Sequence, residues 1–238
     1  MKVAFCTTCK GRAQHIEQTL PRNLADNPDG VFVLLDYNSQ DHLRDYVRRH
    51  HGAMDSGRLA YYRTEDYPVF QMAHAKNMAH RLGILEGADV VVNLDADNFT
   101  GPGFAQYVAG QFDKPNKFLW SRMVKNGADR TPRGINGRIA VTSQAFLKVG
   151  GYDEQFSTWS PDDKDFNLRL RRLGYQAHEI DRQYLEAVLH NDKMRFREYK
   201  HVSTHPGEES EEGLHDADTT VVNGGKIGCG TVYRNFGS

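Results

Sequence analysis

The sequence predicts an α/β fold in which a mostly parallel sheet is flanked by helices. Over the first 100 residues, short apolar runs rich in β-branched residues alternate with segments of helical periodicity. Strands and helices in this alternating order are typical of parallel sheets with right-handed crossovers. The chain has 238 residues and no linker rich in proline, glycine or serine in its middle, which favours a single domain with a C-terminal tail.

The elements follow one another in a regular order. The first strand is expected over 2–7, followed by a helix over 13–24 whose apolar residues share one face. A second buried strand over 31–35 and a short helix come next. The remaining expected strands are 59–63, 90–94, 118–120, 139–142, 176–179 and 184–189. The remaining expected helices are 72–82, 104–112, 143–149 and 162–173.

Charge and composition exclude several classes of function. Lysine and arginine number 30 against 31 aspartate and glutamate, and they are scattered, so we expect no nucleic-acid partner. The apolar runs are strand-sized and the N-terminus leads directly into a strand, which predicts a soluble, cytoplasmic protein with no transmembrane segment. Cys6 and Cys9 have the spacing of a redox motif, but no partner features accompany them, and the odd number of cysteines, 3, argues against a disulfide scaffold.

Polar residues follow three of the expected strands, at 7–12, 36–38 and 95–98. The clearest case is Asp95 and Asp97, which stand one residue apart after the buried run 90–94. In a parallel sheet these strand ends meet at one edge, where α/β proteins bind ligands. Carboxylate oxygens bind hard divalent cations, so the pair indicates a metal site for a phosphorylated ligand. The alternative is an ordinary solvated turn, because aspartate and asparagine are common turn residues.

The second half of the chain also contains candidate functional residues: two adjacent aspartates, a histidine and a pair of glycines. Asp162 and Asp163 fall in the first turn of an expected helix, where they could be ordinary capping residues or a positioned general base. His190 follows the last expected strand; a lone histidine is more often structural than a ligand, and only its place at a strand end makes it a candidate. Gly150 and Gly151 predict a turn with positive φ or a close backbone approach to a ligand.

This ordered series of motifs resembles the GT-A class of nucleotide-sugar glycosyltransferases over roughly the first 200 residues. Within that class it is most similar to the inverting β-1,4-galactosyltransferase-like group, and more loosely to family 2 enzymes and polypeptide GalNAc-transferases. Five segments carry the resemblance. Residues 10–16 are similar to an Arg-Asn-Arg-x-x-His-Leu signature, and Trp-Ser-Pro-Asp-Asp-Lys-Asp at 159–165 is similar to Trp-Gly-Gly-Glu-Asp-Asp-Asp. The other three are Asp-Ala-Asp at 95–97, the expected strand, helix and turn of 136–152, and the late histidine segment 190–193.

The resemblance implies a GT-A domain over 1–203, with a nucleotide-binding half over 1–100 and an acceptor and catalytic half over 101–203. A polar, glycine-rich tail over 204–238 would follow, and we expect it to be flexible and to fold back over the domain. The implied reaction is metal-dependent transfer of a sugar from a nucleoside diphosphate sugar, with a UDP-sugar favoured. The acceptor would be a hydroxyl group of a glycan or another molecule.

The resemblance also implies roles for individual residues. Asp97 and His190 would be ligands of Mn²⁺ (or Mg²⁺), with Asp95 contributing metal or ribose contacts, and the imidazole ligand favours Mn²⁺. Asp163 would be the general base of an inverting reaction, while Asp162 binds acceptor hydroxyls or holds the loop. The residues expected to bind the donor are Thr7, Thr8, Arg12, Asp36, Asn38, Lys76, Asn77, Asp95 and Trp159.

Departures from the family pattern leave alternatives open. Ser160 and Pro161 replace two glycines that approach the sugar in the family, so galactose is not implied, and Lys164 replaces an acid. A retaining, GalNAc-transferase-like enzyme and a catalytically inactive module that binds nucleotide sugars are the alternative functions. A sugar-nucleotide pyrophosphorylase is disfavoured, because no glycine-rich phosphate loop follows the first strand. Asp36 has an alternative as a helix-entry residue with no ligand role.

Overall fold

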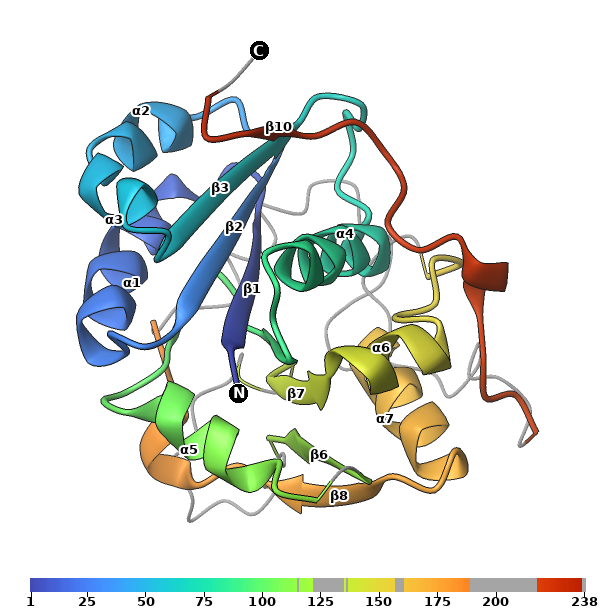
Figure 1. The fold of residues 1–238 in the computed structure, drawn as a ribbon. Helices are drawn as coiled ribbons and strands as arrows, with labels where there is room; N and C mark the ends of the chain where they lie inside the picture. The colour runs from blue at the N-terminus through green and yellow to red at the C-terminus, as the bar shows by residue number, and fades with distance from the viewer. Residues whose placement is uncertain (115, 122–134, 136, 157–160, 189–217, 237–238) are drawn as a thin grey trace.

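The computed structural model describes residues 1–114, 116–121, 135, 137–156, 161–188 and 218–236. An eight-stranded sheet in the order β10-β3-β2-β1-β4-β7-β6-β8 forms its centre (Figure 1). The strands of this sheet are β1 (Val3–Cys9), β2 (Val31–Tyr37), β3 (Leu59–Thr64), β4 (Val90–Asn93), β6 (Lys117–Trp120), β7 (Ile139–Thr142), β8 (Gln176–Glu179) and β10 (Tyr233–Arg234). A second, two-stranded sheet pairs β5 (Asn98–Phe99) with β9 (Glu186–Ala187).

The direction of the strands brings most of their carboxyl ends to one edge of the sheet. Strands β3, β2, β1 and β4 are parallel neighbours. Strand β7 is antiparallel to both β4 and β6, so β6 and its parallel neighbour β8 point the same way as β4. The mostly parallel α/β sheet expected from the sequence is confirmed. The edge that holds the carboxyl ends of these strands is called the carboxyl edge below.

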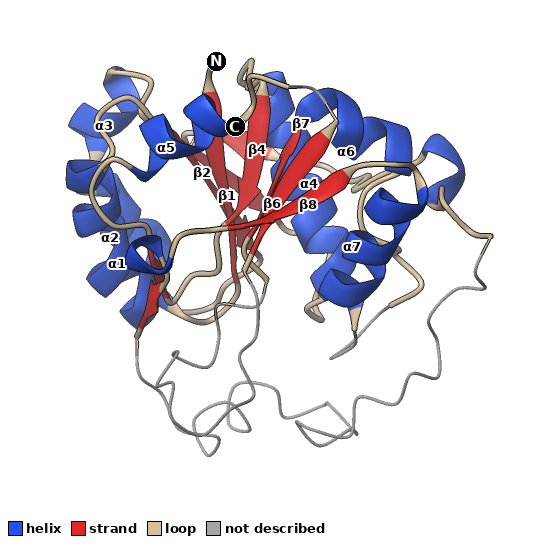
Figure 2. Cartoon of the chain, turned by 90° about the horizontal axis from the view of Figure 1, so that it is seen from below, coloured by secondary structure: helices blue, strands red, loops and turns tan. Residues whose placement is uncertain are grey.

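Helices cover both faces of the sheet, as the strand–helix alternation requires. The helices on one face are α1 (Ala13–Asp26), α2 (Leu43–Arg48), α3 (His51–Asp55) and α5 (Phe104–Gln111), and those on the other are α4 (Met72–Leu85), α6 (Ser143–Val149) and α7 (Asp162–Arg172) (Figure 2). Successive residues of a strand point to opposite faces, so each strand supplies both layers of the core. In β1, for example, Val3 and Phe5 point into the layer that contains α1 and α5, where Phe5 stacks on Phe104 of α5, whereas Ala4 and Cys6 point into the layer that contains α4.

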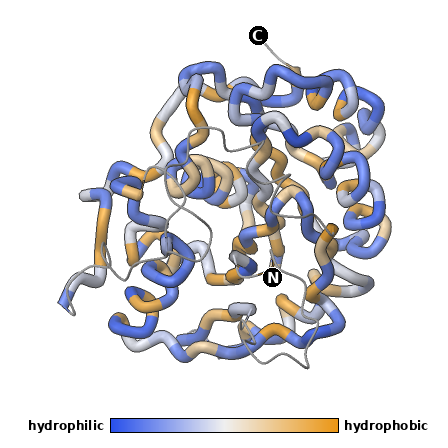
Figure 3. The backbone as a smooth tube through the Cα atoms, turned by 180° about the vertical axis from the view of Figure 1, so that it is seen from behind, coloured by the Kyte–Doolittle hydropathy of each residue, from blue (hydrophilic) through white to orange (hydrophobic). Residues whose placement is uncertain are grey.

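Continuous apolar runs make the central strands, because these strands are buried on both faces. Figure 3 shows them as the hydrophobic centre of the chain, surrounded by helices of mixed character. Local chemistry sets the ends of the helices. Helix α6 begins where the hydroxyl of Thr142 accepts a hydrogen bond of 3.1 Å from the backbone N–H of Ala145, and it ends at Gly150, whose φ is 77°.

The structure refines two expectations about local structure. In the segment expected to be a strand over 184–189, the described residues form a 3-10 turn over Arg182–Tyr184 and then the two-residue strand β9. The tail was expected to fold back over the domain, and its described part, 218–236, does so: β10 pairs with the edge strand β3, and the buried Ile227 packs in the core beside α4 (Figure 1). A backbone rich in glycine can lie close against α4, where a Cβ on Gly228 would be only 2.3 Å from the backbone nitrogen of Met78.

The redox alternative for the first cysteine pair is wrong. Cys6 and Cys9 both lie within β1 and point into opposite layers of the core. Burial raises the pKa of both thiols far above the usual range, so neither provides a reactive thiolate. Within the described residues, no helix combines the length and the apolar character that a membrane span requires.

Candidate active site

Aspartates from two distant parts of the chain converge at the carboxyl edge, next to Gly137. Because β7 is antiparallel to β4, the residues just before β7 lie opposite those just after β4. A Cβ on Gly137 would lie 2.9 Å from Oδ2 of Asp163, 3.1 Å from Oδ2 of Asp95 and 3.3 Å from Nδ2 of Asn93. We call the point where these three side chains meet the Gly137 junction. Asn93 holds it together, since Nδ2 donates to Oδ1 of Asp95 (3.1 Å) and to the carbonyl of Gly137 (2.9 Å).

Lys76 ties the start of α7 to α4 beside this junction. Its Nζ donates to Oδ2 of Asp162 and to Oδ1 of Asp163, each at 2.7 Å, and it lies 5.0 Å from the centre of the Tyr152 ring. The Lys76 side chain is 4% exposed and that of Asp162 is 2% exposed, whereas Asp163 keeps 28% of its side chain accessible. Of the two adjacent aspartates, Asp163 is therefore the one that a substrate can reach.

Burial perturbs the titration of these carboxylates. Burial raises the pKa of Asp95 to about 6; the charge of Lys76 opposes the shift and that of Asp97 adds to it. Burial raises the pKa of Asp162 to about 7, again opposed by Lys76, while the negative charge of Asp163 raises it further. Lys76 itself is held charged, because attraction to Asp162 and Asp163 outweighs the effect of burial and raises its pKa well above the usual value. Such perturbed groups are typical of functional sites.

Asp97 follows Asp95 by two residues and is 4% exposed. Its side chain accepts a hydrogen bond of 2.8 Å from the amide of Asn98, and its backbone carbonyl accepts one of 2.7 Å from the N–H of Val188. The chain that leads to His190 therefore passes directly beside Asp97. His190 itself lies outside the described residues, as does Trp159. Among the residues that the structure places, no group of three His, Cys, Asp or Glu side chains forms a complete metal site.

A ladder of polar side chains on α1 and at its C-terminal end holds the segment that contains Asp97, and it was not foreseen from the sequence. Thr19 Oγ1 donates to the carbonyl of Ala96 (2.8 Å), and Asn23 Nδ2 donates to the carbonyl of Asn98 (2.9 Å). Asn27 Nδ2 continues the ladder with a 2.7 Å bond to the hydroxyl of Thr100. The signal was present in the sequence: Thr19 and Asn23 stand four positions apart on the buried face of α1, where apolar residues are the rule, and the buried Asn27 follows at the same spacing just after the helix.

A buried arginine behind the aspartates was missed as well. Arg138 is fully buried, donates from Nη2 to Oδ1 of Asn98 (2.9 Å), and donates from Nη1 to the carbonyl of Tyr184. Burial lowers its pKa to about 10, and the charges of Asp95 and Asp97 oppose this shift. Arg138 thus places a positive charge near two of the carboxylates from within the core. Its neighbour Gly137 was quoted in the sequence analysis only as part of a motif.

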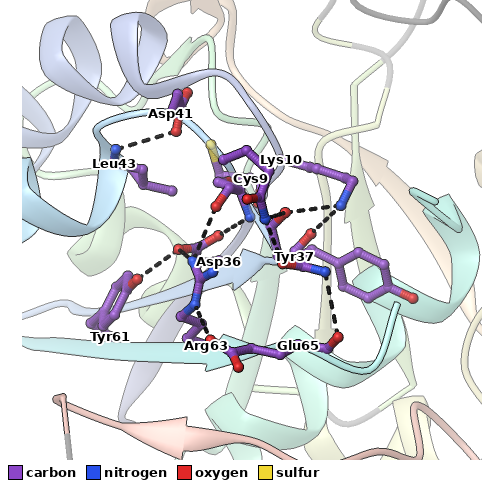
Figure 4. Close-up of polar contacts among 12 residues, drawn as sticks. Cys9, Lys10, Asp36, Tyr37, Asp41, Leu43, Tyr61, Arg63 and Glu65 are labelled. Atoms are coloured by element: carbon purple, nitrogen blue, oxygen red, sulfur yellow. Dashed lines mark hydrogen bonds and ion pairs between the residues drawn. The ribbon is translucent and has the colours of Figure 1, made fainter. Parts of the chain in front are cut away.

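Asp36 is fully occupied by other protein groups. Its Oδ2 accepts hydrogen bonds from the hydroxyl of Tyr61 (2.7 Å) and from Arg63 (2.6 Å), and its Oδ1 accepts from the backbone N–H of Ser39 (2.7 Å) (Figure 4). The side chain has no exposed surface. These contacts support the alternative in which Asp36 shapes the turn into α2. In the same corner, the ammonium of Lys10 donates to the carbonyl of Tyr37 at 3.0 Å and so braces the end of β2.

The other expected donor-binding residues are spread over the carboxyl edge. Asn77 is fully buried, and its amide makes 2.7 Å hydrogen bonds to both the N–H and the carbonyl of Tyr152, so it holds the turn after α6. Thr7 is buried and lines a small cavity that Asp95 also lines. The remaining three expected donor-binding residues are all half-buried. Thr8 lies in β1, Arg12 at the start of α1, and Asn38 after β2 with a φ of 59°.

Comparison with known families identifies a related domain in the second half of the chain. A family model described as the N-terminal domain of galactosyltransferase matches residues 125–202. This range includes Gly137, Asp162, Asp163 and His190. No curated protein sequence gives a significant match.

Solved structures resemble the chain over most of its length. One is the mannosyltransferase PcManGT from Pyrobaculum calidifontis in complex with GDP-Man and Mn²⁺, with a TM-score of 0.64, 19% identity, and 84% of this chain and 61% of that chain covered. GalNAc-T7 with UDP, GalNAc and Mn²⁺ has a TM-score of 0.60 and 13% identity, and the match covers 76% of this chain and 42% of that chain.

A third similar structure is the catalytic domain of Drosophila beta1,4galactosyltransferase 7 in complex with xylobiose. Its TM-score is 0.55 with 16% identity, and the match covers 82% of this chain and 73% of that chain. This chain spans less than two thirds of the mannosyltransferase and GalNAc-T7 chains. At these identities the likeness concerns the fold, and together with the family match it confirms the resemblance predicted from the sequence: the chain has the GT-A fold of nucleotide-sugar glycosyltransferases.

Proposed function

We propose that the protein transfers a sugar from a nucleoside diphosphate sugar to an acceptor hydroxyl, in a metal-dependent reaction that inverts the anomeric carbon. The observation that carries the proposal is the Gly137 junction. It brings Asp95, from the expected metal-binding motif, and Asp163, the expected base, to the same point at the carboxyl edge. A donor held by the first residue and an acceptor activated by the second would then meet there.

Asp163 is the group we assign as general base. The acceptor oxygen forms a bond to the anomeric carbon while the bond from that carbon to the diphosphate oxygen breaks, the diphosphate keeps the electron pair, and the acceptor proton passes to Asp163. Asp163 is the more accessible of the two aspartates, and its Oδ2 points to the Gly137 junction while Oδ1 is bound by Lys76. Asp162 is too buried to bind an acceptor hydroxyl directly and holds Lys76 instead.

Asp97, His190 and Asp95 are the residues we assign to hold Mn²⁺ (or Mg²⁺). A cation suits this donor set, because the negative charge of Asp97 adds to the raised pKa of Asp95, and a bound cation would offset the repulsion between the two carboxylates. The N–H of Val188 on the carbonyl of Asp97 supports His190 as the third ligand, since His190 follows two residues later. When bound, the ion supplies Lewis-acid stabilisation of the leaving diphosphate.

A nucleoside diphosphate sugar is the donor class we assign, with UDP favoured. Two of the similar structures are complexes with GDP-Man and Mn²⁺ and with UDP, GalNAc and Mn²⁺, which supports a diphosphate nucleotide together with this metal. Thr7, Thr8, Arg12 and Asn38 remain the proposed donor contacts, together with Trp159. The acceptor we assign is a glycan or another molecule with a free hydroxyl.

A retaining reaction is the second candidate, and the likeness to GalNAc-T7 favours it. The chain nevertheless places a reachable carboxylate at the Gly137 junction, as an inverting mechanism requires of its base. The configuration of the anomeric carbon in the first-formed product separates the two reactions.

A thermal-shift panel of UDP-, GDP-, CMP- and dTDP-sugars, with and without Mn²⁺, tests the proposed function. A ligand at a hundredfold excess over its Kd adds about 2.7 kcal/mol to the stability of the folded protein. We expect a rise in Tm with one nucleotide class that requires Mn²⁺ and disappears in Asp97→Asn. Stabilisation by none of the four classes, or equal stabilisation in EDTA, would contradict the proposal.

A further inference from the structure

Lys76 is bound to α7, although the resemblance assigned it to the donor. Both carboxylates that its ammonium reaches, Asp162 and Asp163, lie in the first turn of α7, and its side chain is 4% exposed. An ammonium has three N–H donors in a compact head. Two of them are used by the carboxylates, and the adjacent face of Tyr152 provides a favourable cation–π contact.

The hydrogen bond from Lys76 gives the two carboxylate oxygens of Asp163 different surroundings. Oδ1 is fixed by the 2.7 Å hydrogen bond from Lys76, and Oδ2 is the oxygen that lies at the Gly137 junction. A carboxylate held by one oxygen cannot rotate about its bond to Cβ without losing that hydrogen bond. The orientation of the second oxygen toward Asp95 is therefore set by Lys76.

The positive charge of Lys76 lies among several acidic and titratable side chains. The charged and titratable groups that face it are Asp162 and Asp163 at the start of α7, Asp95 after β4, Tyr152 in the turn after α6, and His80 one turn further along α4. A nearby positive charge stabilises the ionised form of a carboxylate. Without Lys76, Asp162 and Asp163 would lose the ammonium that bridges them at the start of α7.

We propose that Lys76 is a positioning residue that acts through Asp163: its hydrogen bond to Oδ1 orients the free oxygen of Asp163 toward the Gly137 junction. This inference rests on the proposed function, because it concerns the residue assigned as its base. It replaces the expectation that Lys76 binds the donor.

Lys76→Met is the direct test, because methionine keeps the length of the chain and removes the charge. Hydrolysis of the donor that the protein binds, with water as the acceptor, gives kcat. We expect kcat to fall about tenfold or more in Lys76→Met, since a misplacement of about 1 Å in a reacting group can lower turnover by about 10²-fold. Lys76→Arg, which keeps N–H donors at this position, should restore part of kcat. Lys148→Met, an exposed lysine of α6, is the matched control and should leave kcat unchanged.

Calorimetric titration with UDP and with GDP, each with Mn²⁺, separates positioning from donor binding. We expect the Kd of whichever nucleotide binds to change less than threefold in Lys76→Met, while kcat with the corresponding donor falls. A loss of nucleotide affinity of tenfold or more with an unchanged kcat would overturn the inference and restore Lys76 as a donor ligand.

Lys76→Gln provides a second variant, should the buried Lys76→Met fold poorly. Its shorter side chain cannot hold Oδ1 of Asp163 in the same way, so kcat should again fall while the nucleotide Kd changes less than threefold. A kcat within twofold of that of the unaltered protein, in a variant that folds and binds the nucleotide, would also overturn the inference. If neither nucleotide binds the unaltered protein, the proposed function fails; if nucleotide binding and turnover are both normal in Lys76→Met, only the inference about Lys76 fails.

Discussion

Gly137→Ala adds one methyl group at the point where the two carboxylates meet. The new Cβ would lie 2.9 Å from Oδ2 of Asp163 and 3.1 Å from Oδ2 of Asp95, whereas ordinary contacts begin at 3.4 Å. The carboxylates must therefore move apart by several tenths of an ångström. A misplacement of about 1 Å in a reacting group can lower turnover by about 10²-fold, so we expect a loss of about 10- to 100-fold and weaker Mn²⁺-dependent nucleotide binding.

The stability of this variant should change little. Gly137 does not have the positive φ that disfavours alanine, and alanine lowers the entropy of the unfolded chain, which contributes about 0.4–1 kcal/mol in favour of folding. Calorimetric titration of UDP and GDP with Mn²⁺, donor turnover and thermal unfolding measure the three effects. Gly110→Ala in α5, where a Cβ meets nothing within 4 Å, is the control and should keep full binding. Binding and turnover within twofold of the unaltered protein in Gly137→Ala would refute the reasoning.

Three further substitutions test other parts of the site. Asp163→Asn should lower turnover by about 10²–10⁴-fold with nucleotide affinity kept, and near-full turnover would exclude Asp163 as the base. Arg63→Met leaves the buried charge of Asp36 without its ion pair, so urea denaturation should show a loss of about 3 kcal/mol, and a loss below 1 kcal/mol would show that the remaining hydrogen bonds suffice. Thr19→Val removes the hydrogen bond to Ala96, between the two metal-site aspartates, and should weaken Mn²⁺ binding about tenfold by calorimetry, whereas unchanged affinity would limit the ladder to a structural role.

The fold could be predicted from sequence because its signals are local. The run 90–94 is apolar at every position except Asn93, as a strand buried on both faces requires, and β4 lies there with its neighbours β1 and β7. The helix expected over 72–82 is α4, and Asp162 and Asp163 do begin α7. Two-residue strands such as β9 and β10 are too short to leave a readable alternation, so their pairing was not foreseen.

Pairings between distant residues could not be read from sequence. Lys76 and Asp163 are 87 positions apart, and the resemblance by itself pointed Lys76 to the donor. Asp36 illustrates the same limit: its partners Tyr61 and Arg63 lie on the next strand, at a register that only the folded sheet defines. Motif order located the right segments of the chain, whereas the division of tasks among their side chains depends on three-dimensional contacts.

Hydrolysis of the donor that the protein binds, with water as the acceptor and ¹H NMR as the readout, tests the central claim without knowledge of the natural acceptor. The account predicts that the first-formed sugar has the opposite anomeric configuration to the donor, that its formation requires Mn²⁺, and that Asp163→Asn abolishes it while still binding the nucleotide. A first product with the donor's own configuration, or hydrolysis that continues unchanged in EDTA, would contradict the account.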